Sequence, residues 1–161
     1  MPQEYNDEKE MNEAERAKIL AIDDDENTRR SLSTVLEEEG YEVDVAASGH
    51  EAVAKSRMNL YNLALVELRL PDMDGTRLLT EMKEIVPGMV KTIIPGYPSL
   101  ANAIEAVNRG VDKYMVKPYG IDDLLHRIEE SLKRQREAKR YNEETAKEYI
   151  ETRFREAATI G

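Results

Sequence analysis

The chain has 161 residues, of which 40% are hydrophobic, so it is long enough for one domain with a buried core and a tail of a few helical turns. With 35% charged residues and a formal net charge of −10, the protein is not expected to be attracted to nucleic acid phosphate, and we predict no nucleic acid partner. It contains no cysteine, which excludes disulfides, thiolate metal sites and a cysteine nucleophile.

Residues 1–17 are acidic and contain almost no side chain that could be buried, so we predict a disordered leader before the folded domain. A signal peptide would instead begin with basic residues and continue with an apolar stretch. No apolar run in the sequence approaches the roughly 18 residues that a membrane-spanning helix needs. We therefore expect a cytoplasmic location and no membrane partner.

Over residues 18–132, short apolar runs alternate with amphipathic stretches, which is typical of an α/β fold with helices on both faces of a parallel sheet. Central strands of such sheets are nearly continuous in apolar residues, as are 19–22, 63–66 and 90–94. Edge strands alternate between apolar and polar residues, as do 41–45 and 112–116. The pattern predicts a doubly wound, five-stranded parallel sheet with the flavodoxin-like strand order 2-1-3-4-5.

Glycine, proline and capping residues mark the ends of the helices between these strands. Gly40 is placed to end the first helix in a left-handed conformation, and Ser48 with Glu51 has the spacing of a capping box. The third helix is expected to stop before Pro87 and the fourth at Gly110. The residues that we expect to face the sheet are Leu32, Val35 and Leu36, then Leu78, Leu79, Met82 and Ile85, and then Ala103, Ile104 and Val107.

The last helix is predicted to extend well beyond the domain. After Gly120 there is no proline, and the next glycine is Gly161, so nothing interrupts a helical extension over 133–161. Its basic run has acidic neighbours, which favours a solvated face over nucleic acid contact. The residues expected to face the sheet are Ile121, Leu124, Leu125, Ile128 and Leu132. Beyond them lies an irregular, less polar stripe that could pack on the domain or on a second copy: Ala138, Tyr141, Thr145, Tyr149 and Phe154.

Candidate functional residues follow the predicted strands, because ligands bind outside the carboxyl ends of parallel strands. The first strand is followed by Asp23 and Asp24, the third by Glu67, the fourth by Pro95 and the fifth by Lys117. Several carboxylates opposite one lysine form an oxygen-rich site that suits Mg²⁺. Asp23, Asp24 and Glu67 are therefore a possible, weak Mg²⁺ pocket.

Three segments, residues 19–25, 63–75 and 114–118, resemble the signatures of a response-regulator receiver domain in order and separation. The resemblance implies a CheY-like fold and a role in two-component phosphorelay signal transduction, as a signalling module and not as an enzyme. It also implies that Asp23 and Asp24 bind Mg²⁺ and that Lys117 contacts phosphate. Tyr114 matches the family's aromatic switch position, although strand alternation alone would also explain a tyrosine there.

Two positions depart from the family pattern. The phosphoacceptor aspartate is replaced by Glu67, whose carboxylate lies one methylene, about 1.5 Å, further out, and in-line phosphoryl transfer is sensitive to such a shift. The phosphate-contacting hydroxyl is replaced by Pro95, which offers neither a hydroxyl nor an amide proton. We expect aspartyl-phosphate chemistry to be lost or badly impaired.

Glu67 has several interpretations. It could pair with Lys117 and imitate part of the phosphorylated state, or the site could have decayed and left a structural ion pair. A glutamate introduced deliberately as a phosphomimic is a third interpretation, and Pro95 argues against it because such a design would keep the hydroxyl.

The favoured prediction is a stand-alone, phosphorylation-independent receiver that acts through protein contacts of its fourth helix, fifth strand and fifth helix. The same face and the C-terminal helix could form a homodimer. One alternative is a functioning phosphoacceptor, phosphorylated by a histidine kinase on Glu67 or Asp24. A remote alternative is a flavodoxin-like nucleotide-binding protein, which the lack of a glycine-rich phosphate loop disfavours.

Overall fold

The computed structural model describes residues 16–96, 99–115 and 120–160. Most of the predicted leader and Lys117 lie outside these described ranges. Within them, no helix is long and apolar enough to cross a membrane.

Five parallel strands form one sheet in the order β2-β1-β3-β4-β5, as predicted. The alternating runs supply the two edge strands and the continuous runs supply the centre, because a central strand is covered on both faces. The strands are β1 (Lys18–Ile22), β2 (Glu42–Ala46), β3 (Leu63–Val66), β4 (Val90–Ile93) and β5 (Lys113–Tyr114). The order of the strands brings the carboxyl ends of β1, β3 and β4 side by side, where the candidate site lies.

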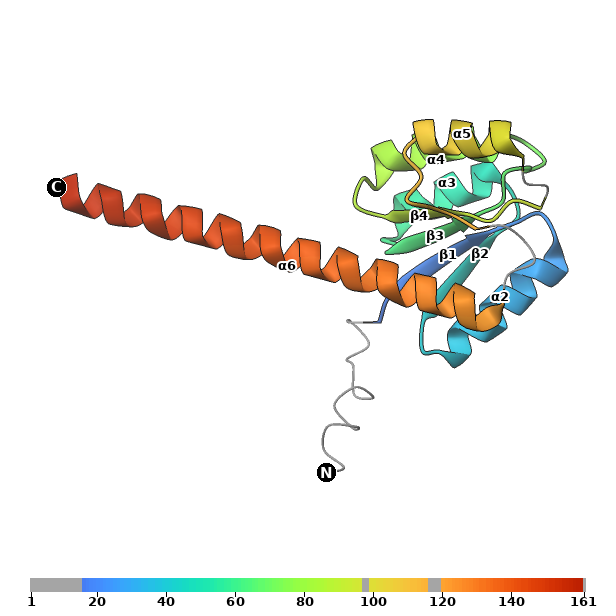
Figure 1. Cartoon of the computed structure of the whole chain (residues 1–161), viewed down its shortest axis with the longest axis horizontal. Helices are drawn as coiled ribbons and strands as arrows, with labels where there is room; N and C mark the ends of the chain where they lie inside the picture. The colour runs from blue at the N-terminus through green and yellow to red at the C-terminus, as the bar shows by residue number, and fades with distance from the viewer. Residues whose placement is uncertain (1–15, 97–98, 116–119, 161) are drawn as a thin grey trace, which may run out of the picture.

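Helices cover both faces of the sheet (Figure 1). On one face, β1 residues such as Leu20 and Ile22 pack in one hydrophobic cluster with α3, α4 and α5. On the other, Ile19 and Ala21 join a second cluster with α2 and α6. The helices are α2 (Glu26–Glu38), α3 (Gly49–Met58), α4 (Gly75–Ile85), α5 (Leu100–Asn108) and α6 (Ile121–Ile160). The fold is therefore the predicted doubly wound α/β architecture with a long C-terminal helix.

The helix ends agree with the sequence signals except at one cap. Gly40 follows α2 with a φ of 93°, a left-handed conformation that glycine adopts without steric cost. The Ser48 hydroxyl accepts from the Glu51 amide at 3.2 Å, as a capping box requires. Glu51, however, accepts from the amide of Ala47 at 2.9 Å, one residue before the expected Ser48. The box is thus shifted by one residue, and the amino end of α3 is still capped.

The predicted burial was wrong on α5. Ala106 is buried there, whereas Ile104 is 52% and Val107 66% exposed. Apolar residues lie on adjoining faces of this short helix, so their spacing alone did not show which face is buried. Ile121 at the start of α6 is likewise 56% exposed, although Leu124, Ile128 and Leu132 are buried as expected.

Candidate functional site

Glu67 lies directly after β3, at the centre of the sheet's carboxyl edge. It is only 7% exposed. Its backbone amide donates to the carbonyl of Ile22 at 2.9 Å, which continues the pairing of β3 with β1 for one more residue. The backbone is therefore held in register, and the side chain extends from a rigid position.

The Glu67 carboxylate folds back onto the backbone amides around it. Its Oε1 atom accepts from the amides of Gly96 at 3.0 Å, Leu68 at 3.1 Å and Arg69 at 3.4 Å. Converging amides of this kind form an anion-binding nest, since each N–H dipole points its positive end at the same oxygen. The nest at the end of β3 and β4 therefore holds the protein's own carboxylate.

Gly75 permits this close packing, whereas a Cβ at Gly96 would make only ordinary van der Waals contacts. A Cβ on Gly75, the first residue of α4, would lie 2.5 Å from the carbonyl oxygen of Glu67, which is too short for any side chain. The Gly75 amide donates to the carbonyl of Leu68 at 2.7 Å and so fastens the loop after Glu67 to α4. At Gly96 a Cβ would lie 3.5 Å from Glu67 Oε2. The segments around Glu67 are therefore held close by backbone contacts.

Pro95 lies between β4 and Gly96 and is buried. The residue before it continues the strand, because the Ile94 amide donates to the carbonyl of Val66 at 2.9 Å. Pro95 has no N–H and no hydroxyl, so the chain contributes the Gly96 amide to the nest and nothing from the position before it.

The two aspartates after β1 have different surroundings. Asp23 is 7% exposed, and its Oδ1 accepts from the Asp25 amide at 2.9 Å. Asp25 in turn caps α2 by accepting from the Thr28 amide at 3.0 Å. Asp24 is exposed to solvent. Asp23 thus takes part in the turn that starts α2, while Asp24 points away from the interior.

Asp23, Asp24 and Glu67 are the carboxylates that could bind a metal ion. Asp23 and Glu67 both line a cavity of about 10 Å³, which is room for about one water molecule. Over the described ranges, no three side chains of Asp, Glu, His or Cys lie close enough together to hold a metal ion. A weak Mg²⁺ pocket made by Asp23, Asp24 and Glu67 stays a prediction.

Tyr114 lies in the edge strand β5 with its ring against the core cluster of α3, α4 and α5. Its hydroxyl is buried, and among the residues that the structure describes it has no hydrogen-bond partner of standard geometry. Burial raises the pKa of this phenol, the backbone of Ser99 acts in the opposite direction, and the negative charge of Glu67 raises it further. The side chain therefore points inward, within electrostatic range of the nest.

The amides of Leu68, Arg69 and Gly96 are the site groups that the sequence analysis did not identify. Backbone donors carry no residue-type signal, and Gly96, in the loop after β4, is 29 positions away in the sequence. Lys117, the suggested partner of Glu67, lies outside the described residues. The amino end of α3 also helps to hold the site. The Asp72 carboxylate accepts from the Gly49 and His50 amides of α3, both at 2.8 Å, and these bonds anchor the loop after Glu67.

The chain is similar to proteins of one known family. The family model described as response regulator receiver domain matches residues 19–129. The transcriptional regulatory protein ZraR of Salmonella typhimurium is 35% identical over 119 residues, which are 74% of this chain and 27% of that protein. The chain therefore spans about a quarter of the length of this curated relative.

Solved structures give the same family. A CheY-like receiver domain protein from Methanospirillum hungatei superposes with a TM-score of 0.74 at 42% identity, covering 76% of this chain and 98% of that one. A response regulator from Burkholderia pseudomallei, solved with a phosphorylated aspartic acid, a calcium ion and citrate, has a TM-score of 0.65 at 30% identity. That match covers 68% of this chain and 64% of the other.

Proposed function

The chain belongs to the response regulator receiver domain family, and on that premise we propose that it is a phosphorylation-independent receiver. Receiver domains are signalling domains of two-component systems and interact with histidine kinases and effector proteins. In our proposal this receiver works through protein contacts, in one signalling state, and is not an enzyme. A cytoplasmic location is part of the same proposal.

The contact between Glu67 and the three amides carries this proposal. A phosphoryl group bound after β3 would need N–H donors for its equatorial oxygens, and among the described residues the amides of Leu68, Arg69 and Gly96 lie there. Glu67 Oε1 already accepts from all three. The glutamate therefore satisfies internally, with one negative charge, the donors that a phosphoryl group would bind.

The position of Pro95 supports the same conclusion. Its buried side chain cannot donate a hydrogen bond to a phosphoryl oxygen, so an incoming group would have one contact fewer and would have to displace Glu67 from the nest. The inward Tyr114 is consistent with a fixed state, because its buried hydroxyl lies within range of the Glu67 charge.

The surface through which the receiver acts is proposed to be the outer face of α5, β5 and α6. Ile104 and Val107 form an exposed apolar pair on α5, three residues apart and therefore on one side of the helix. Exposed apolar side chains of this kind are typical of protein contact sites. The double variant Ile104→Ser, Val107→Ser is expected to lose binding to the protein partner. Its midpoint of thermal unfolding should not fall.

A second candidate is a functioning phosphoacceptor. Asp24 favours it, because this carboxylate is exposed beside the buried Asp23 and is open to attack on a phosphodonor. The family typically binds Mg²⁺ at the phosphorylation site, so such a reaction would require the ion. In this reading the chain would be a conventional phosphorelay partner of a histidine kinase.

Intact mass after incubation with Mg²⁺ and either acetyl phosphate or phosphoramidate separates the two candidates. The phosphorylation-independent receiver stays at its unmodified mass with both donors. A gain of one phosphate that is lost under mild alkali would favour the phosphoacceptor. Fragmentation of the modified protein would then assign the adduct to Asp24 or Glu67, since loss of the adduct in Asp24→Asn could also come from loss of a Mg²⁺ ligand.

Three variants test whether both departures from the family matter. Glu67→Asp alone is expected to regain at most slow phosphorylation, because Pro95 still lacks a hydroxyl. Pro95→Thr alone should stay unmodified, since Glu67 still occupies the nest. The double variant should be phosphorylated at least ten times faster than Glu67→Asp, the magnitude expected for one added hydrogen bond of about 1.4 kcal/mol in the transition state. Full phosphorylation rates in Glu67→Asp alone would contradict the role of Pro95.

A further inference from the structure

The loop after Glu67 is attached to the first turn of α3 by one carboxylate. The Asp72 side chain is 21% exposed, and its two oxygens accept separately from the Gly49 and His50 amides, both at 2.8 Å. The His50 ring adds a contact, because its Nδ1 lies against Asp72 Oδ2. Asp72 and Gly49 are 23 positions apart in the sequence, so this contact joins two separate segments of the fold.

The negative charge of Asp72 suits the start of a helix. Amides in the first turn have no partner within the helix, and the helix dipole favours an anion beside them. In α3 two of these amides donate to Asp72, and a third, that of Glu51, donates to the Ser48 hydroxyl. The bond from the His50 amide lowers the pKa of Asp72, although burial acts in the opposite direction. The attached loop therefore favours the ionised carboxylate.

The next residue of the loop adds a close packing contact with α3. Met73 is 8% exposed and belongs to the core cluster of α3, α4 and α5. A Cβ on Gly49 would clash with the Cγ and Sδ atoms of Met73, so the methionine packs where only a glycine leaves room. The first turn of α3 thus binds the loop through a carboxylate and a thioether that are adjacent in the sequence.

The loop that α3 binds supplies two of the three nest amides. The amides of Leu68 and Arg69 donate to Glu67 Oε1 at 3.1 and 3.4 Å. The third donor, the Gly96 amide, follows β4 and does not belong to this loop. A movement of the loop would therefore change two contacts of Glu67 and leave the third in place.

The base of the loop is closed by backbone pairing. The Gly75 amide donates to the Leu68 carbonyl at 2.7 Å, and Arg69 pairs with Asp74 in an antiparallel bridge. Asp72 lies at the tip, beyond both pairs. Because a short loop closed in this way moves as a unit, a displacement of its tip turns the Leu68 and Arg69 amides. The Arg69 contact, at 3.4 Å the longest of the three, is the first that such a movement would break.

We propose that Asp72 is a positioning residue for the Glu67 nest, and that its contact with the first turn of α3 is a latch on the signalling state. While the latch is closed, the loop holds its two amides on the Glu67 carboxylate. When the latch is released, these two donors leave the carboxylate. The latch is accessible from solvent, since the His50 side chain is 77% exposed. The signalling state is that of the proposed function, on which the inference rests.

Amide hydrogen exchange of the full chain, followed by NMR, tests the latch with Asp72→Ala. The Leu68 and Arg69 amides are expected to exchange about ten times faster than in the parent, the factor for one lost hydrogen bond of about 1.4 kcal/mol. The Gly96 amide should keep its exchange rate, because it lies outside the loop. Unchanged exchange at Leu68 and Arg69 would overturn the proposal.

Asp72→Asn is the conservative variant. Its side chain keeps one acceptor oxygen and can retain one of the two bonds to α3. The exchange rates of Leu68 and Arg69 are therefore expected to lie between those of the parent and of Asp72→Ala. Rates as fast as in Asp72→Ala would mean that the acceptor oxygens do not hold the loop, and the proposal would fail.

Ser48→Ala distinguishes a latch from a general loosening of α3. It removes the other side-chain cap of this helix, which accepts from the Glu51 amide at 3.2 Å, and leaves Asp72 in place. The first turn of α3 should exchange faster, while Leu68 and Arg69 keep the parent rate. Faster exchange of both loop amides in this control would contradict the latch. A phosphate gain in the intact-mass experiment would instead contradict the proposed function and leave the coupling measured here unchanged.

Discussion

The first three turns of α6 and the turns after Leu132 form one unbroken helix, but different forces hold them in place. Leu124, Ile128 and Leu132 are at most 2% exposed and belong to the core cluster beside β1 and β3. Tyr141 and Phe154, further along the same helix, are 68% and 73% exposed. The first segment is fixed by burial, and the second projects from the domain without a covering element in Figure 1.

This difference separates two properties that one helix usually combines. Helix formation requires only backbone hydrogen bonds and good helix formers without proline or glycine, and both segments satisfy this. A fixed position in the molecule requires an apolar face against a partner surface, which the sheet provides as far as Leu132. The distal segment is therefore a helix that still has an apolar face to bury.

Truncation of one apolar side chain in each segment should give the largest difference between them. Leu124→Ala is expected to lower the free energy of unfolding by about 3 kcal/mol, because it removes buried contacts and leaves a cavity. Tyr141→Ala should change it by less than about 0.5 kcal/mol, since the ring is exposed. Urea unfolding at low protein concentration measures both. Similar losses in the two variants would show that the distal segment is held by the domain.

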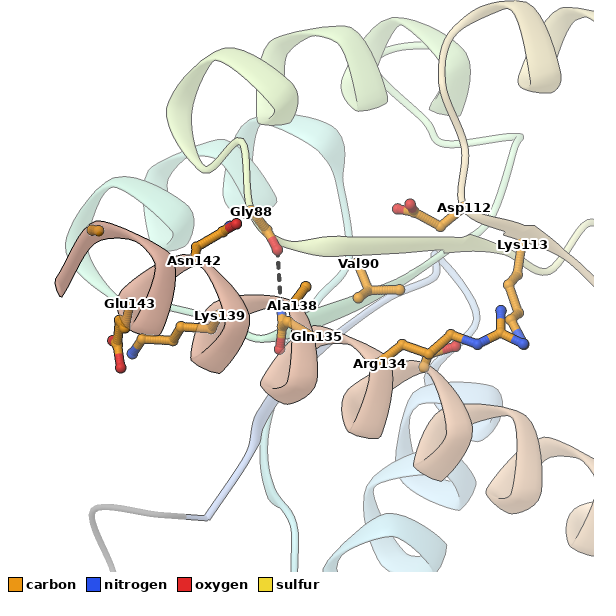
Figure 2. Close-up of a pocket in the computed structure, with 12 residues that line it drawn as sticks. Gly88, Val90, Asp112, Lys113, Arg134, Gln135, Ala138, Lys139, Asn142 and Glu143 are labelled. Carbon is orange, nitrogen blue, oxygen red and sulfur yellow. Dashed lines mark hydrogen bonds between the residues drawn. The ribbon is translucent and has the colours of Figure 1, made fainter. Parts of the chain in front are cut away.

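Gln135 lies at the boundary between the buried and the projecting segments of α6, where it lines a groove of about 760 Å³ between α6 and the amino ends of β4 and β5 (Figure 2). Gln135→Ala removes the two hydrogen bonds to Asn62 and Gly88 and is expected to cost about 1 to 2 kcal/mol. Hydrogen exchange should accelerate in α6 after residue 135 and stay unchanged at Leu124. Arg136→Ala, exposed and one residue along, is the control and should leave exchange unaltered. Unchanged exchange in Gln135→Ala would mean that these bonds do not anchor the helix.

The smallest expected effect is the difference between replacing a buried lysine and replacing a solvated one. Lys91 in β4 is 3% exposed, and burial lowers its pKa although Asp112 acts in the opposite direction. Between that lowered value and about 10.5, the unfolded chain binds more protons, so the free energy of unfolding rises with pH in this window. Below the lowered pKa the penalty of burying the charge is fully present.

Replacing the two lysines makes the pH dependence measurable. Lys91→Met should raise the free energy of unfolding by on the order of 1 kcal/mol at neutral pH, and its advantage over the parent should shrink as pH approaches 10. Lys139→Met on the exposed part of α6 is the control, because it removes the same charge without changing the core. Chemical unfolding at a series of pH values gives both curves, and a constant advantage for Lys91→Met would contradict the burial argument.

Much of the fold was determined by the sequence. Continuous and alternating apolar runs distinguished the central strands from the edge strands, because a strand covered on both faces must be apolar throughout. Gly40, Gly110 and Pro87 marked helix ends through local backbone preferences, and the uninterrupted run after Gly120 predicted the long α6. The position of Glu67 at the carboxyl edge of the sheet followed from the strand order alone.

Tertiary structure decided the features that depend on segments far apart in the sequence. Glu67 Oε1 meets the Gly96 amide because β3 and β4 end side by side, and a backbone donor leaves no trace in residue types. The buried face of α5 depended on how the helix packs on the domain, since its apolar residues occupy adjoining faces. The groove depended on the direction in which α6 leaves the domain past Gly88. Local patterns determine which elements form, but only their packing places an amide beside a carboxylate or leaves an apolar face uncovered.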